Sequence, residues 1–121
     1  MAGRGFGLVA AHGDGWSTFG GAGLLEAAEE DFWSGLADQS AEVDAACRRT
    51  GRDPRGLRRS LLLGYGTLRP LVSADAYVRA VERAEAAGFD EVVVYWPHGE
   101  PGDRFWSEVG VHHSAVSRLR G

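Results

Sequence analysis

Two short apolar runs that lack polar alternation constrain the fold of this chain most. Residues 58–65 contain three consecutive leucines between arginines and glycines, and residues 91–96 contain three consecutive valines. A compact apolar run bounded in this way is typical of a strand that is buried on both faces. Residues 16–19 predict a third, short strand, because glycines flank them on both sides. Strands of this kind indicate a parallel sheet.

Amphipathic helices are expected between and after these strands. Apolar residues recur on one helical face in residues 31–50, 73–88 and 104–120. The second segment opens on a serine, a good N-cap, and Gly51 and Gly88 are expected to end the first two helices in a left-handed conformation. The residues expected to face inward are Phe32, Leu36, Val43, Cys47, Tyr77, Val81, Ala84, Phe105, Val109, Val116 and Leu119.

The resulting order of strand and helix, repeated three times, predicts the α/β class. We expect three consecutive β/α units with parallel strands in a single domain over residues 1–121. The 121 residues suffice for one domain, and the apolar share of 44% argues against intrinsic disorder. A three-stranded parallel sheet leaves two edges with unpaired backbone groups. The chain is therefore expected to pair with another subunit or to form part of a larger fold.

Composition excludes several classes of function and location. A net charge of −4 argues against general nucleic-acid binding, which needs a basic surface. No apolar run approaches the roughly 20 residues of a membrane helix, and the first residues lack the form of a secretory signal. The single cysteine, Cys47, excludes an intrachain disulfide and fits a reducing compartment. We therefore expect a cytoplasmic protein. The 18 glycines indicate many turns.

Several motifs, in their order and spacing, resemble one protein family. A glycine-rich turn at residues 3–5 precedes an apolar segment that ends in Gly-Asp-Gly-Trp at residues 13–16. Gly-Arg-Asp-Pro at residues 51–54 closes a helix before the strand at residues 58–63, and Ala-Ala-Gly-Phe-Asp-Glu-Val-Val-Val occupies residues 86–94. Together they resemble the C-terminal part of a luciferase-like monooxygenase, in the group that depends on a flavin or a deazaflavin.

The resemblance implies a fold, an activity and a cofactor. Members are (β/α)8 TIM barrels of about 250 residues, so the chain would supply the last three units as a partial, truncated domain. The implied function is that of an oxidoreductase or monooxygenase that uses FMN or a deazaflavin and needs the rest of the barrel. The remaining units of the barrel would come from a complementing barrel subunit or from a homo-oligomer. The alternative is a non-catalytic truncated homologue that acts as an oligomerising or binding module.

The resemblance also places part of the cofactor's phosphate site at Gly3, Arg4 and Gly5. Glycines let backbone N–H groups approach an anion, and an arginine offers a bidentate fork. The competing interpretation is a glycine-rich terminus with an exposed arginine. We assign no catalytic residue in this chain, because the other contacts of the family's cofactor lie in units that have no counterpart here.

Other candidate site residues each have a structural interpretation. Tyr65 and the pair His98 and Glu100 follow predicted strands, where a barrel carries its site, and that pair would suit acid–base chemistry. A histidine in a polar loop is, however, more often only solvated. We favour structural packing for Trp16, which would otherwise line a barrel mouth.

No metal site is expected. His112 and His113 are adjacent, so on a helix they point about 100° apart and do not readily bind one ion. Cys47 lies on the apolar face of its helix and is interpreted as a buried structural thiol. The acidic residues between Glu26 and Asp31 are interpreted as the solvated start of a helix.

Overall fold

The computed structural model describes residues 6, 10–64, 69–96, 99–103, 106 and 108–120. Its order of elements follows the predicted alternation of strands and helices. The elements are β1 (Gly15–Thr18), η1 (Ala22–Leu24), α2 (Glu29–Arg49), η2 (Pro54–Gly56), β2 (Arg58–Leu62), η3 (Pro70–Val72), α3 (Ala74–Ala86), β3 (Glu91–Val93) and α4 (Val109–Arg120).

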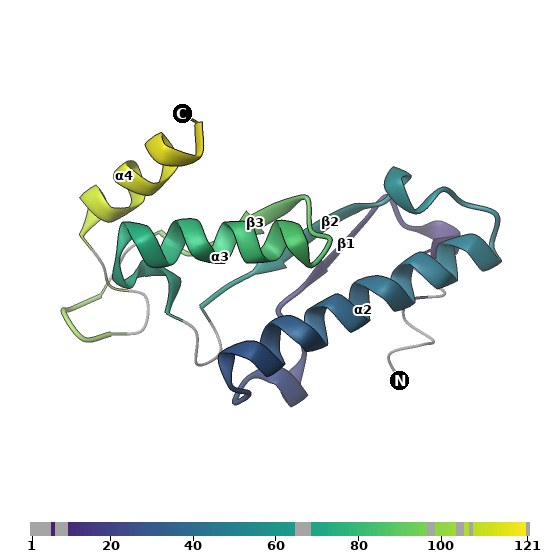
Figure 1. Ribbon diagram of the computed structural model, residues 1–121, viewed down its shortest axis with the longest axis horizontal. Helices are drawn as coiled ribbons and strands as arrows, with labels where there is room; N and C mark the ends of the chain where they lie inside the picture. The colour runs from purple at the N-terminus through teal and green to yellow at the C-terminus, as the bar shows by residue number, and fades with distance from the viewer. Residues whose placement is uncertain are drawn as a thin grey trace.

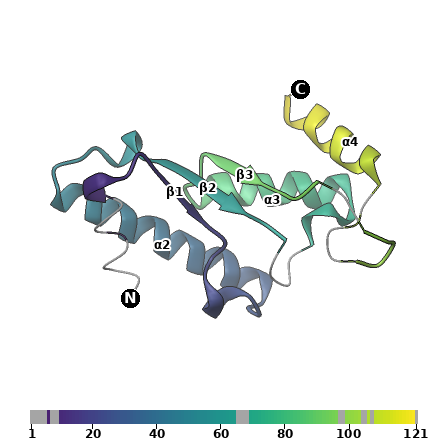
Figure 2. The same cartoon turned by 180° about the vertical axis from the view of Figure 1, so that it is seen from behind.

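The three strands form one parallel sheet in the order β1-β2-β3, which confirms the predicted α/β class. In the register, Trp16 lies beside Arg59, and Leu61 lies beside Val92. Figure 1 shows α2 and α3 on one face of the sheet, and Figure 2 shows the opposite face from behind, without a described helix over it. The sheet is thus covered by helices on one side.

Alternate side chains of each strand meet the helices, and these form the core. On this face Trp16 and Leu61 are buried, whereas Ser17 and Arg58, which have the opposite parity, are exposed. Trp16 stacks on Phe89, with ring centroids 5.6 Å apart, and meets Phe6 edge to face at 5.5 Å. The other core side chains are Ala10, Phe32, Trp33, Leu36, Val43, Ala46, Cys47, Leu57, Leu63, Ala80, Ala84 and Ala87.

Local signals set the ends of the two long helices. The Ser73 hydroxyl accepts a hydrogen bond from the Ala76 N–H at 3.0 Å, so Ser73 is the predicted N-cap of α3. Gly51 and Gly88 have φ angles of 79° and 99°, the left-handed conformation expected where α2 and α3 end. All four residues predicted to face inward from α2 are buried.

Two sequence predictions were wrong in detail. The last helix begins at Val109 rather than near residue 104, and it buries Ala115, while Val109 and Leu119 are 41% and 43% exposed. A small alanine allows α4 to approach α3 closely, so the bulkier apolar residues fall outside the contact. The strand at residues 91–96 ends at Val93, because the residues that pair with it, 60–62, end there too.

Among the helices that the structure describes, none combines the length and the apolar character that crossing a membrane requires.

Candidate functional site

The three parallel strands end at the same edge of the sheet, and the segments that follow them meet there. β1 leads through η1 to the start of α2, β2 leads to η3 and α3, and β3 leads toward α4. In open parallel sheets and in barrels, ligands bind beyond this carboxyl edge. A site is therefore expected at this edge.

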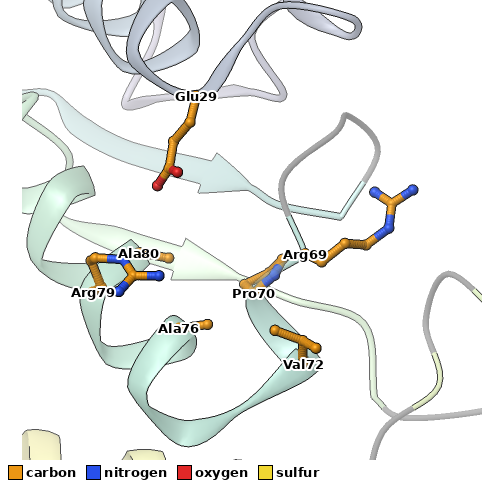
Figure 3. Close-up of a pocket in the computed structure, with 7 residues that line it drawn as sticks. All are labelled: Glu29, Arg69, Pro70, Val72, Ala76, Arg79 and Ala80. Carbon is orange, nitrogen blue, oxygen red and sulfur yellow. The ribbon is translucent and has the colours of Figure 1, made fainter.

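A cavity of about 250 Å³ lies between the start of α2 and α3 at this edge. Figure 3 shows the Glu29 side chain reaching from α2 toward α3, and the Arg69 side chain turned away from Arg79. The remaining lining residues are Pro70, Val72, Ala76 and Ala80. The cavity thus combines a largely apolar wall with a carboxylate on one side and a guanidinium on the other.

Ion pairs between helices hold the wall of this cavity in place. Arg83 donates from both terminal nitrogens to the two carboxylate oxygens of Glu30, at 2.9 and 3.0 Å, and so ties α2 to α3. This hydrogen bonding, reinforced by the positive charge, lowers the pKa of Glu30. Arg83 also lies over the Trp33 ring, 5.7 Å from its centroid.

Asp75 links α3 to the last helix. Arg118 donates a hydrogen bond to its carboxylate, which, with the charge of Arg118, lowers the pKa of Asp75. Arg79 adds to the lowering, so this guanidinium of the cavity also lies within the field of Asp75. The charges at the two ends of α3 therefore hold both α2 and α4.

A second cavity, of about 280 Å³, lies beside the first. Arg69 and Val72 line both cavities. The second one is otherwise lined by Leu71, Gly102, Asp103, Trp106, Glu108 and Val111. Each cavity is below the ordinary volume of a cofactor pocket, roughly 300–1,000 Å³. At this edge, neither cavity alone has enough space for a whole flavin.

The charged residues that line the two cavities at this edge are suited to binding an anion. Arg69 and Arg79 are cations suited to an anionic group such as phosphate or carboxylate. Among the described residues, no serine, cysteine or histidine lines either cavity. Within the described part of the chain, no group of three or more metal-ligating side chains comes together. Redox chemistry at this edge would have to come from a bound cofactor.

Several sequence candidates lie outside the described residues. These are Gly3, Arg4 and Gly5, together with Tyr65 and His98. Of the proposed acid–base pair, Glu100 is exposed, and its backbone N–H donates to the Asp103 carboxylate at 2.8 Å. The described cavities depend instead on Glu29, Arg69 and Arg79, which we did not single out from the sequence. The sequence signal that could have found them is their position: Arg69 follows the second strand, and Glu29 and Arg79 lie on the two helices that follow the first and second strands.

Other candidates have the structural roles that we favoured for them. Trp16 is packed in the core between two phenylalanine rings, and Cys47 is fully buried. The acidic side chains that start α2 are exposed. His112 lies beside Tyr77, whose hydroxyl is 3.3 Å from the His112 Nδ1, and its ring is 5.6 Å from that of Trp96. Burial raises the pKa of Tyr77.

The opposite, amino edge of the sheet is organised around a buried arginine. The side chain of Arg59 is 7% exposed and donates to the Asp44 carboxylate, to the Ser40 carbonyl at 3.2 Å and to the Pro54 carbonyl at 3.3 Å. Its backbone N–H donates to the Asp90 carboxylate at 2.8 Å. These bonds join α2, η2, β2 and the start of β3, so this edge is a structural one.

Comparison of the chain with protein-family models, with curated proteins and with solved structures gives no match.

Proposed function

We propose that this chain supplies three β/α units of a luciferase-like oxidoreductase, and that it is active when further units complete a (β/α)8 barrel. The observation that carries the proposal is the order β1-β2-β3 of parallel strands, with α2 and α3 on one face. In a barrel, helices cover the outside and the other face of the sheet lines the interior. The uncovered face of this sheet would be that interior.

The uncovered face carries polar groups as well as apolar ones. Ser60 donates a hydrogen bond to the Glu91 carboxylate, and Arg58 approaches the same carboxylate at 3.1 Å. Arg58 and Glu91 are the first residues of β2 and β3, and Ser60, in the middle of β2, lies beside Glu91 in the register. Farther along, Leu62 lies beside Val93 in the register. This distribution supports an interior that is closed by polar contacts at one end and apolar toward the other.

The proposed cofactor is FMN or a deazaflavin, whose phosphate would lie at Gly3, Arg4 and Gly5. A reduced cofactor of this kind supplies hydride transfer or oxygen activation. At the carboxyl edge, the guanidinium group of Arg79 suits an anionic part of the cofactor or substrate. The two cavities at the carboxyl edge each have too little volume for the ring system, which is why the proposal requires further units. We assign the protein to the cytoplasm, where its unpaired Cys47 would stay reduced.

The alternative is a non-catalytic module that works by association. A specific observation favours it: Val93, Tyr95 and Trp96 are large, apolar and 41–60% exposed along one edge of the sheet. An edge strand with exposed apolar residues is a surface for pairing with another strand.

Titration with FMN, with a reduced deazaflavin and with inorganic pyrophosphate tests the cofactor proposal. The parent chain is compared with Arg4→Ala and with the matched control Arg49→Ala, an exposed arginine at the end of α2. Loss of a charge-assisted, bidentate contact should weaken binding by about 10-fold or more in Arg4→Ala, and the control should equal the parent. Equal affinities in all three chains would remove the assignment of the phosphate site.

A further inference from the structure

Exposed apolar side chains follow one another along β3 and its continuation. Val93, Tyr95 and Trp96 are 46%, 41% and 60% exposed. The strand order places β3 at an edge of the sheet, and Figure 2 shows it at the margin away from β1. A cavity of about 290 Å³, lined in part by Phe89 and Val92, lies between this edge and α3. The edge is therefore open on the side of the helices too.

The backbone of β3 has donors and acceptors directed to this open edge. The Leu63 N–H donates to the Val93 carbonyl at 3.0 Å, so the backbone groups of Val93 face β2. Alternate residues of a strand turn their backbone groups to opposite sides, so those of Val92 and Val94 face away from β2. Hydrogen bonds from another strand are the means by which such groups are satisfied in a buried sheet.

We propose that β3 pairs with β3 of a second copy of this chain, antiparallel, about a two-fold axis that passes between the two Val93 residues. The N–H groups of Val92 and Val94 in each copy donate to the carbonyls of Val94 and Val92 in the other. This is the exchange of both bonds that defines a hydrogen-bonded antiparallel pair. The two Val93 residues then form a non-hydrogen-bonded pair, and the two sheets become one continuous sheet with its helices on one face.

The side chains of this register favour a second copy as the occupant. Val92 lies opposite Val94 of the second copy on the helix side, and Val93 lies opposite its own equivalent on the uncovered side. Glu91 lies opposite Tyr95 of the second copy, so no like charges face each other. Glu91 also already has Arg58 and Ser60 as partners within its own copy. A strand that is complementary to itself in this way suits the isologous interface of a two-fold dimer.

This inference rests on the association function, the alternative given above, and adds its partner and its geometry. It makes no use of the cofactor. A chain that binds flavin as a monomer would refute the dimer and leave the barrel proposal in place. A colourless dimer that behaves as described below would support the dimer while the titrations decide the phosphate site separately.

Charge substitutions at Val93 test the two-fold axis. Sedimentation equilibrium of the parent should show a dimer, and Val93→Lys and Val93→Glu should each be monomeric, with dimerisation weakened on the order of 100-fold by the facing like charges. A mixture of the two variants should dimerise again, because opposite charges then face each other. Val109→Lys is the matched control, since Val109 is 41% exposed, close to the 46% of Val93, but lies at the start of α4. Circular dichroism verifies that each variant is folded.

A cysteine at the same position provides an independent readout. In a non-hydrogen-bonded antiparallel pair the Cα atoms lie about 4.5 Å apart, which is within the range of a disulfide. Mild oxidation should therefore link Val93→Cys into a covalent dimer, and the control Val109→Cys should stay unlinked under the same conditions. A parent that is monomeric at about 1 mM overturns the proposal. A dimer that persists in Val93→Lys also overturns the proposal, because the two copies would then associate through a surface other than β3.

Discussion

Replacing Arg59 with methionine should destabilise the fold more than any exchange of an exposed arginine. Methionine keeps much of the apolar stem of arginine but removes the guanidinium that joins α2, η2 and β2. The carbonyls of Ser40 and Pro54 would lose these donors, and the Asp44 carboxylate would lose its charged partner. Removing one partner of a buried ion pair costs about 3–5 kcal/mol.

The exposure of Asp44 places the expected cost at the lower end of that range. Its side chain is 34% exposed, whereas that of Arg59 is 7% exposed, so water can replace part of what the carboxylate loses. Asp44, Pro54 and Arg59 also line an open groove of about 570 Å³, which gives water a path to the carbonyl. We therefore expect Arg59→Met to lower the free energy of unfolding by about 3 kcal/mol and the melting temperature by roughly 10 °C.

Urea unfolding of four chains measures this effect: the parent, Arg59→Met, Asp44→Asn and the double variant. Arg55→Met is the matched control, because Arg55 lines the same groove and is exposed, and it should change the free energy of unfolding by less than about 0.5 kcal/mol. The double variant should lose less than the sum of the single losses, since the two residues share one interaction. An Arg59→Met chain within about 1 kcal/mol of the parent would refute the structural role of the amino edge.

Three further substitutions test other contacts of the same structure. Gly51→Ala and Gly88→Ala both place a side chain at a positive φ, and the first should cost about 1 kcal/mol in urea unfolding. Gly88→Ala should cost about 2 kcal/mol, because its Cβ would also lie 3.3 Å from both the Cβ and Oγ of Ser40; equal losses would contradict this contact. At Glu91, the hydrogen bond from Ser60, reinforced by Arg58 against the opposing effect of burial, holds the pKa below its ordinary value of 4.5. The stability that this provides is present above pH 4.5 and is lost as the pH falls through the lowered pKa. Glu91→Gln should therefore be less stable than the parent at pH 7, and the difference in thermal melts should shrink as the pH falls below 4.5. A difference that does not shrink on acidification would show that the loss has another cause.

The elements of the fold could be predicted because their signals are local. The serine at position 73 and the glycines at positions 51 and 88 act within one turn of the chain, and each has the predicted role. The runs of leucines and valines without polar alternation are local signals too, and they indicated buried parallel strands. Helix α4 was placed less well, because its buried face is decided by how closely it can approach α3, and a single alanine carries no periodic signal.

The two edges of the sheet could not be distinguished from the sequence. Arg58 and Arg59 are neighbours of the same type, yet one is exposed beside Glu91 and the other is buried against Asp44. Neighbouring residues of a strand point to opposite faces of the sheet, and only one of these faces is covered by α2. Which face that is becomes known only when the sheet and the helix are placed together. Arg69 and Arg79 likewise line one cavity, although Arg69 precedes η3 and Arg79 lies in α3.

The different construction of the two edges bears on which proposed function applies. The amino edge is held by a buried arginine whose bonds connect four elements, so it should be stable in the isolated chain. The carboxyl edge has two small open cavities, and the β3 edge has exposed valine and aromatic side chains. A chain that is well connected at one edge and open at the others can fold first and then acquire a partner. If the partner is a second copy, β3 is occupied by an antiparallel strand and the carboxyl edge stays open to small anions. If it is a set of further β/α units, a parallel strand must take the same place, and the Val93→Lys chain should then lose flavin binding along with assembly.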